Sequence, residues 1–383
     1  MIKAIYRTSF TCEVDQASKE TVKNGEQMDF FEFPSFDEDD SATEAENVKQ
    51  NPPAFVPGSP YLDSVKDVWA IEDLYIDVDF DETFVARDKY ELLSWATAQL
   101  CLSPSASIML QEAMEDGWCV GIEDLSGPDF HLDVPEKMIV LDDNGMLLSA
   151  LARSEYFRNM LLVSYIRALR DVWQEKRHGG FDEEYAPENI LMLERVRAAD
   201  LDVLAVFCGW ELRGEGHGSL WRHLIGSEDG DIAMRFSGYL ERDPSSLFNG
   251  QALAAAFSQW FRDIRRVSTC EHEVMNDLDI IMAEREDADM VFGNERLTRI
   301  KLETLSCLPD RTAYLQGKGS EILADPLYAG MQSMVNQAHL MQIIHDIQVT
   351  RVQNVPFRDS NLAQKIFPNG LFTPEAEVPV QSE

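Results

Sequence analysis

The 383-residue sequence has few basic residues: 33 Lys and Arg stand against 68 Asp and Glu, which gives a formal net charge of −35. A polyanion repels the phosphate backbone of nucleic acids and the anionic surface of membranes, so we expect neither as a partner. The same charge favours a basic protein as the partner, and no sequence feature identifies which one.

Cysteine pairs and long apolar runs are also missing. The six cysteines lie far apart without a C-x-x-C pair, and several sit inside apolar runs, which indicates reduced core thiols rather than disulfides or a zinc knuckle. The N-terminus has no continuous apolar segment of the signal-peptide type, and no stretch reaches the length of a membrane span. We therefore expect a cytoplasmic protein.

Catalytic motifs are absent as well. None of the seven histidines is three or four residues from another, so the chain has no H-E-x-x-H motif. The nearest fragment is CEHEVMND, in which His272 and Glu273 are followed at the i+4 position by Asn276, a poor ligand. His272 is a weak metal candidate, and the plainer interpretation is a helix-start residue among carboxylates. The chain also lacks a G-x-S-x-G elbow, a phosphate-binding loop and a dinucleotide fingerprint.

Apolar residues make up 45% of the chain and aromatic residues 10%, enough to fill a large core. The segment from Glu26 to Glu46 has nine acidic residues and no Lys or Arg, and prolines follow it, which predicts a disordered acidic arm at residues 1–65. Within this arm, DFFEFPSF (residues 29–36) is either a docking motif for a basic, apolar groove or a set of incidental aromatics. The predicted domain covers residues 66–370, and a flexible tail covers 371–383.

The order of periodic segments predicts an α+β fold that is mostly helical, with a small β-sheet of two to four short strands around residues 118–142. Helical periodicity marks a helical C-terminal half. The predicted helices are 89–102, a segment capped by Ser103 or Ser105 that ends at Gly117, 154–178, 187–214, 231–241, 252–265, 272–285 and 328–350.

The helix at 154–178 contains an unusual polar stripe. Its apolar residues lie on two sides, which implies burial on both flanks, and the narrow stripe between them includes Arg167 and Asp171. These two residues are one turn apart, so we expect them to form an ion pair that faces a cleft.

The chain resembles a family at this point. A capped helix is followed by the strands of GWCVGIEDL…FHLDVPEKMIVLDDNG, by a helix that ends in Trp173-Gln174 and by the next helix with ERVRAAD. This order of segments resembles that of the small zincin-like metallopeptidase domains of bacteria, a group otherwise of unknown function. The resemblance covers about residues 100–215. It implies a zincin-like fold, in which the helix before the Trp-Gln pair carries H-E-L-R-H.

In that family, two histidines of this helix hold zinc, the glutamate activates a water, and the next helix supplies an acidic third ligand. The first histidine position corresponds to Arg167, the glutamate position to Ala168 and the second histidine position to Asp171. Glu194 and Asp200 represent the third-ligand helix. The resemblance therefore implies former ligand positions without the ligands.

Three hypotheses follow for the function. The preferred one is a catalytically inactive protein, a pseudoenzyme of metallopeptidase fold that needs no cofactor and serves as a binding or scaffold module. The second is an active zinc-dependent peptidase with unusual ligands, such as Asp171, Glu194, Asp200 or His272. The third is a helical interaction protein whose acidic arm recruits a basic partner.

Overall fold

The computed structural model describes residues 67–75, 84–125, 127–284, 292–348, 350–352 and 355–357. These residues belong to a compact unit from Pro53 to Glu383. The predicted arm at 1–65, its aromatic segment at 29–36 and the predicted tail at 371–383 lie outside the described residues. Their predicted boundaries therefore stay predictions.

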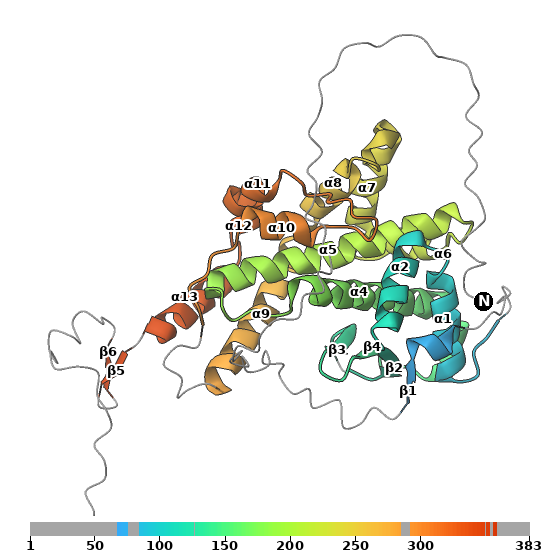
Figure 1. Ribbon diagram of the computed structural model, residues 1–383, viewed down its shortest axis with the longest axis horizontal. Coiled ribbons are helices and arrows are strands. Elements are labelled where there is room, and N and C mark those ends of the chain that lie inside the picture. The colour runs from blue at the N-terminus through green and yellow to red at the C-terminus, as the bar shows by residue number, and fades with distance from the viewer. Residues whose placement is uncertain are drawn as a thin grey trace, which may run out of the picture. The chain divides into compact units, whose positions relative to one another are not determined.

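The described chain is mostly helical with a small sheet, which confirms the α+β prediction (Figure 1). Its elements, in order, are β1 (Val68–Ala70), the 3₁₀ helix η3 (Ile71–Leu74), α1 (Lys89–Leu100), α2 (Pro104–Glu115), β2 (Cys119–Glu123), β3 (Phe130–Asp133), β4 (Met138–Asp142), α3 (Leu148–Arg153), α4 (Glu155–His178), α5 (Pro187–Gly214), α6 (Ser219–Gly226), α7 (Gly230–Arg242), the 3₁₀ helix η4 (Pro244–Ser246), α8 (Gln251–Trp260), α9 (Ile264–Glu284), α10 (Arg299–Leu305), α11 (Gly319–Ala324), α12 (Pro326–Ala329), α13 (Met334–Gln348), β5 (Thr350–Val352) and β6 (Val355–Phe357).

The larger sheet has the strand order β1-β2-β4-β3. Strands β2 and β4 are parallel, and β1 and β3 pair antiparallel to them on the two edges. Three of these strands lie in the predicted segment, and β1 is an addition that the sequence pattern did not predict. The Asn144-Gly145 turn after β4 has φ values of 57° and 64°, as expected of the two residues that best tolerate left-handed backbone.

The two longest helices begin and end where the capping residues predict. The Oγ of Ser154 accepts the backbone N–H of Phe157 at the start of α4, and Gly179, with φ 72°, ends it. Pro187 occupies the first turn of α5, where a missing N–H is harmless. Of the two candidate caps for α2, Ser103 is the one in place, since its Oγ accepts the N–H of Ala106.

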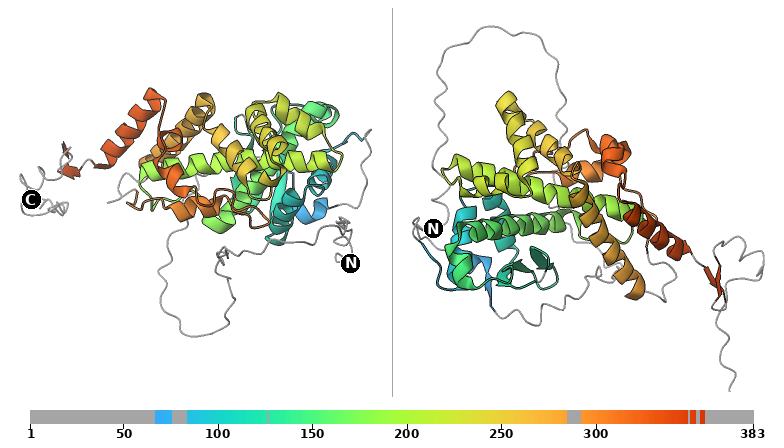
Figure 2. Two further views of the ribbon diagram at one scale, coloured as in Figure 1. Left: turned by 90° about the horizontal axis from the view of Figure 1, so that it is seen from above. Right: turned by 180° about the vertical axis from the view of Figure 1, so that it is seen from behind.

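Helices α4 and α5 form the centre of the core and lie side by side in both figures (Figures 1 and 2). The sheet and helices α1 and α2 pack on α4, whereas α6, α8 and α9 pack on α5. This arrangement buries α4 on both flanks, as its two apolar sides predicted, and it leaves the polar stripe of α4 facing α5. No described helix is both long enough and apolar enough to cross a bilayer.

Two predicted helices differ from the structure. The segment 252–265 is broken, because α8 ends at Trp260 and the side chain of Asp263 accepts the N–H of Arg265, which starts α9. His272 consequently lies in the third turn of a long α9, so its interpretation as a helix-start residue is wrong. The predicted helix at 328–350 is divided into α12 and α13.

Candidate functional site: an arginine cage on α4

Charged side chains of α4 and α5 meet across the interface of the two helices. Four ion pairs join them: Arg167–Asp202, Arg170–Asp200, Asp171–Arg197 and Glu175–Arg197. Residues further along α4 pair with residues earlier on α5, so the helices are antiparallel. The sign of the charge also reverses along the interface: the two α4 arginines face α5 aspartates, and the α4 aspartate faces an α5 arginine.

Arg167 stands at the centre of a cage of carboxylates. Its guanidinium lies 2.8 Å from a carboxylate oxygen of Asp129, 2.7 Å from one of Asp202 and 2.9 Å from one of Asp229. We call these four residues the Arg167 cage. Burial lowers the pKa of Arg167, but the three carboxylates outweigh it and raise the pKa above its usual value. Arg167 is therefore a permanent cation at the position where the resemblance would put the first histidine.

The three carboxylates of the cage come from separate elements. Asp129 directly precedes β3 and is half exposed, Asp202 is on α5, and Asp229 is the residue before α7. The pKa of Asp229 is raised to about 7, because burial and the negative charge of Asp202 outweigh the opposing charge of Arg167. Trp260 donates its indole N–H to Asp202 at 2.8 Å. The cage thus ties the sheet, α5, α7 and α8 to one point of α4.

Ala168 is fully buried in the core. It is part of the hydrophobic cluster that fills the space around α4, so its methyl group packs against other side chains. A methyl group cannot accept a proton, and this position offers no room for a general base.

The predicted pair between Arg167 and Asp171 is wrong. Asp171 instead pairs with Arg197 of α5 at 2.9 Å, and Arg197 also donates to the carbonyl of Gly179 at the end of α4. The physical reason is the packing of α5 onto the stripe. Helix α5 supplies a buried partner of opposite charge to Arg167 and another to Asp171. Solvent and salt screen the attraction within a buried pair less than that within a pair along one helix surface.

Arg197 is surrounded by more than one carboxylate. Its guanidinium lies 3.6 Å from Glu175 and 3.8 Å from Glu194, in addition to Asp171. We call these four residues the Arg197 cluster. Burial raises the pKa of Glu194 to about 7, since the attraction of Arg197 does not offset it and Asp171 adds repulsion. The Oε1 atom of Glu194 is buried without a hydrogen-bond partner. The structure therefore brings Asp171 and Glu194 together, with an arginine between them.

Asp200 belongs to a different environment. It is fully buried, accepts the Nε–H of Arg170 and the hydroxyl of Tyr314, both at 2.6 Å, and accepts the amide of Gln174. We call Arg170, Gln174, Asp200 and Tyr314 the Arg170 layer. Every ligand-capable oxygen of Asp200 is already hydrogen-bonded, so this residue is a structural one and does not face the Arg167 position.

The donor atoms on α4 and α5 do not fit zinc. Zinc in proteins is held by nitrogen, sulfur and carboxylate ligands in tetrahedral geometry, and position 167 has a guanidinium instead. His272 is exposed on α9 and was the weak metal candidate. Within the described ranges, one group of at least three His, Cys, Asp or Glu side chains has its ligand atoms within 4.8 Å of one another. This group consists of Asp124, Asp142 and Asp143.

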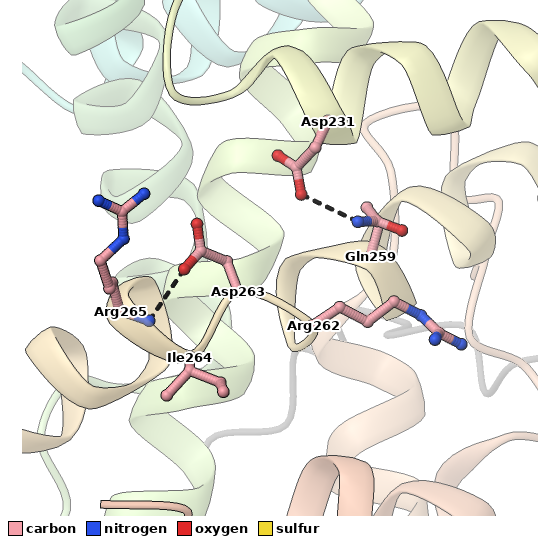
Figure 3. Close-up of a pocket in the computed structure, with 6 residues that line it drawn as sticks. All are labelled: Asp231, Gln259, Arg262, Asp263, Ile264 and Arg265. Atoms are coloured by element: carbon pink, nitrogen blue, oxygen red, sulfur yellow. Dashed lines mark hydrogen bonds between the residues drawn. The ribbon is translucent and has the colours of Figure 1, made fainter.

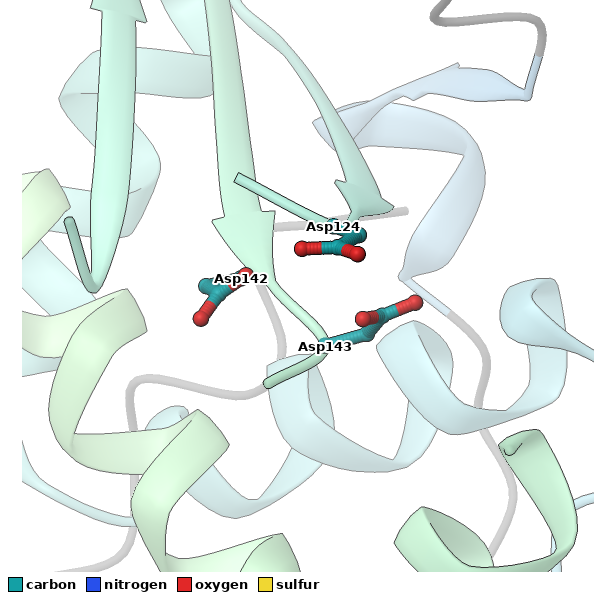
Figure 4. Close-up of side chains that lie close together, drawn as sticks. All are labelled: Asp124, Asp142 and Asp143. Carbon is teal, nitrogen blue, oxygen red and sulfur yellow. The ribbon is translucent and has the colours of Figure 1, made fainter. Parts of the chain in front are cut away.

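These three aspartates lie at the carboxyl ends of β2 and β4 (Figure 4). Asp142 accepts the N–H of Leu125 and Asp143 accepts the N–H of Gly145, both at 2.8 Å, so two of the carboxylates already shape the turns. Burial raises the pKa of Asp143, and the neighbouring aspartates raise it further. An all-oxygen group suits a hard cation such as Ca²⁺ rather than a peptidase zinc.

A hollow of about 360 Å³ adjoins the Arg167 cage. We call it the α9 cleft. Its walls are Arg167, Asp202, Glu228, Asp229, Trp260, Asp263, Arg265, Arg266, Thr269, Cys270 and Glu273. Burial raises the pKa of the Cys270 thiol, and Glu194 and Glu273 raise it further, so this thiol is not an activated nucleophile.

A second hollow lies at the turn between α8 and α9 (Figure 3). Asp263 and Arg265 line both hollows. In Figure 3 the side chains of Arg262 and Arg265 point in different directions, and Gln259 donates to Asp231 at 3.0 Å. Because the two guanidiniums do not converge, this second hollow is a poor anion site.

Sequence reasoning missed Asp129, Asp202, Asp229 and Arg197. Asp202 is two residues after Asp200, a predicted candidate. Asp129 and Asp229 follow no local pattern, since each is brought to Arg167 only by the fold. They are 38 and 62 residues from Arg167 in sequence.

The comparisons with known proteins give one match. The sequence model of a family described as "Putative metallopeptidase family (DUF6782)" matches residues 96–316, which is more than half of the chain. The match extends from α1 through the loop that contains Tyr314, and thus includes the Arg167 cage, the Arg170 layer and the Arg197 cluster. No curated protein and no solved structure matches the chain.

Proposed function

This chain belongs to the Putative metallopeptidase family, and we propose that it is a member without peptidase activity that serves as a protein-binding module. The proposal rests on the Arg167 cage. Where the resemblance puts the first zinc ligand, a buried guanidinium lies within 2.9 Å of three carboxylates. The proposal includes a zincin-like origin of α4 and its sheet, a bacterial source and a cytoplasmic location.

The chemistry of zinc-dependent hydrolysis explains why this observation carries weight. A catalytic zinc needs about three protein ligands, an open position for water and a base that takes the proton of that water. Arg167 supplies a fixed positive charge, which repels a metal ion, and Ala168 supplies no base. The guanidinium of Arg167 already neutralises part of the negative charge of the cage carboxylates. These carboxylates therefore need no metal ion as their counter-charge.

The alternative of an active peptidase with unusual ligands has one observation in its favour. Asp171 and Glu194, two of its proposed ligands, do lie in one cluster. However, Arg197 lies between them, Asp200 is engaged in the Arg170 layer and His272 is exposed. The third hypothesis, recruitment through the acidic arm, concerns residues 1–65 and stays a prediction.

Metal analysis of the purified chain tests the proposal. After equilibration with zinc and gel filtration, elemental analysis should find well below one zinc per chain, and a library of quenched peptides should show no chelator-sensitive cleavage. An Arg167→Ala variant is the informative comparison, since loss of the guanidinium leaves the three carboxylates without their cation. Stoichiometric zinc in the parent chain, together with cleavage that a chelator abolishes, would reverse the proposal and favour the active alternative.

A further inference from the structure

One side of α13 is apolar and exposed. Met334, Val335 and Met341 have 83%, 77% and 71% of their surface exposed, although large apolar side chains are most often buried. Ala338, one turn after Met334, is exposed as well. Single exposed apolar residues are ordinary on a protein surface, whereas several on one side of a helix mark an interaction site.

The periodicity of α13 separates these residues from the core. Leu340 and Ile343 are buried, and the helix packs on α9 and α5. Met334, Ala338 and Met341 recur at the i, i+4 and i+7 positions, so they lie on the side of the helix that faces away from the buried residues. We call the following residues the α13 face: Met334, Val335, Ala338 and Met341.

No charged residue interrupts the α13 face. The sequence from Ser333 to His345 contains no Asp, Glu, Lys or Arg, in a chain of which 26% is charged. His339 lies beside the face and is paired with Asp279 of α9 at 2.7 Å. A charged segment would find no ion-pair partner among the residues of the face. The segment that covers it must therefore bring apolar side chains.

The hairpin after α13 returns the chain to this helix. Strand β5 begins at Thr350, two residues after α13 ends at Gln348, and the antiparallel strand β6 pairs Phe357 with Thr350. Residue 358 therefore starts beside the C-terminal end of α13. This helix has 15 residues and is about 22 Å long, and ten extended residues span up to about 33 Å. The sequence directly after β6 can thus reach the whole α13 face.

The sequence after β6 has a matching composition. Residues 358–383 lie outside the described residues. The segment RDSNLAQKIF (residues 358–367) has one acidic and two basic residues, so it lacks the negative charge of the chain as a whole. Its apolar residues recur at the helical spacing i, i+1, i+4 and i+5, and they are Leu362, Ala363, Ile366 and Phe367.

We propose that residues 362–367 bind the α13 face of the same chain and exclude water from Met334 and Met341. The covalent connection favours this segment over a second copy of the chain. A segment on a short linker has an effective concentration in the millimolar range, whereas a second copy brings another net charge of −35. The inference goes beyond the proposed function, because it does not depend on the absence of peptidase activity.

Photochemical cross-linking of the full chain tests the inference. The photoreactive residue p-benzoylphenylalanine replaces Met341 in one variant and Met234 of α7, which is also exposed, in a control variant. Mass spectrometry of the digested protein should show cross-links from position 341 to residues 358–372 of the same chain. Cross-links from position 234 to these residues should be at least about fivefold weaker. Absence of cross-links between position 341 and residues 358–372 would overturn the inference.

A mixture of isotopes separates the C-terminal segment from a second copy. Equal amounts of unlabelled and ¹⁵N-labelled chains are mixed before irradiation, so only a cross-link between two copies joins a labelled peptide to an unlabelled one. Cross-links from position 341 should join peptides with the same label. If peptides of mixed label are as abundant as those of one label, the α13 face binds a second copy and the inference is wrong.

A matched pair of double variants identifies the side chains that bind. Added to the position-341 variant, Ile366→Ser with Phe367→Ser should lower the cross-link yield at least about fivefold and raise the fluorescence of a dye that binds apolar surface. Asn361→Ser with Gln364→Ser changes polar residues of the same segment and should leave both readouts unchanged. Circular dichroism verifies that each variant is folded. Equal cross-link yields in the two double variants would contradict binding through the apolar side chains.

Discussion

The Arg170 layer and the Arg197 cluster lie on the same interface of α4 and α5, yet their charges are arranged differently. In the layer, one arginine faces one aspartate, both side chains are fully buried, and Tyr314 and Gln174 complete the hydrogen bonds of Asp200. In the cluster, one arginine faces three carboxylates that are about a fifth exposed. The Arg170 layer is balanced in charge and fully buried, and the Arg197 cluster carries an excess of negative charge.

The difference separates structural charges from charges that respond to the surroundings. A buried pair with completed hydrogen bonds holds its protonation state and fixes how two helices meet. In the cluster, burial together with the repulsion of neighbouring carboxylates raises the pKa of Glu194 to about 7, so this group can bind a proton near neutral pH. The Arg167 cage lies between these two cases, since its one cation faces two mostly buried carboxylates, Asp202 and Asp229, and the half-exposed Asp129.

The largest effect is expected from breaking the balanced layer. Arg170→Ala leaves Asp200 as an uncompensated buried charge, which should lower the free energy of unfolding by about 3–5 kcal/mol in urea titrations. Arg177→Ala is the matched control, because Arg177 also stacks on the Trp173 ring but is partly exposed. Its loss should amount to about 1 kcal/mol or less. Equal losses would show that stacking on Trp173, rather than the pair with Asp200, dominates.

A double variant sharpens this result. Arg170→Met with Asp200→Leu removes both charges together, so no buried charge is left without a partner. It should be more stable than Arg170→Ala alone, in line with other buried ion pairs that tolerate apolar replacement. A double variant less stable than the single one would mean that the hydrogen bonds of Asp200 with Tyr314 and Gln174 stabilise the fold more than the charge pair does.

The next effect is a pH dependence of stability. Burial raises the pKa of Glu194 and of Asp229 to about 7, and that of Asp277 to about 6, above the values of the unfolded chain. A carboxyl group with a raised folded pKa favours the folded state when it is protonated, and this contribution is lost as the pH rises through the folded pKa. Between pH 8 and pH 6 the free energy of unfolding should therefore increase.

A substitution in the Arg197 cluster checks the origin of this dependence. Glu194→Gln mimics the protonated side chain, so it should stabilise the chain at pH 8 by about 1 kcal/mol and flatten the pH profile. Thermal melts at several pH values measure both effects. Asp200→Asn in the balanced layer is the contrasting variant, since it should destabilise the chain at every pH. A profile that Glu194→Gln leaves unchanged would place the titrating groups elsewhere.

Local chemistry made much of the fold predictable. Ser154, Gly179 and Pro187 act on their own neighbours, so the ends of α4 and α5 followed from the sequence. The partners of Arg167 could not be predicted from the sequence, because an i, i+4 pattern relates only residues of the same helix. Once α5 packs on the stripe, Asp202 of α5 lies 2.7 Å from the guanidinium of Arg167, and Arg197 of α5 pairs with Asp171. Likewise β1, which is three residues long, has too little pattern to detect and is formed by pairing with β2.

The smallest effect is expected from building a metal site into the unbalanced part of the interface. Arg167→His with Asp171→His places two imidazoles one turn apart on α4. The 2.7 Å contact between Arg167 and Asp202 makes Asp202 the carboxylate that faces the first of these positions, in place of the Glu194 or Asp200 that the resemblance implied. We leave Ala168 unchanged, because a glutamate there would be forced into the filled core.

Zinc should stabilise this double variant and leave the parent chain unaffected. At a zinc concentration threefold above its Kd, linkage amounts to about 0.8 kcal/mol, which thermal melts resolve as a shift of about two degrees. Arg167→His alone is the control, since one imidazole and one carboxylate should bind zinc more weakly. Asp202→Asn added to the double variant should weaken zinc binding further, whereas Glu194→Gln should not. If zinc shifts the melting temperature of none of these variants while each remains folded, α4 is not a former ligand helix, and the cage at Arg167 has another origin.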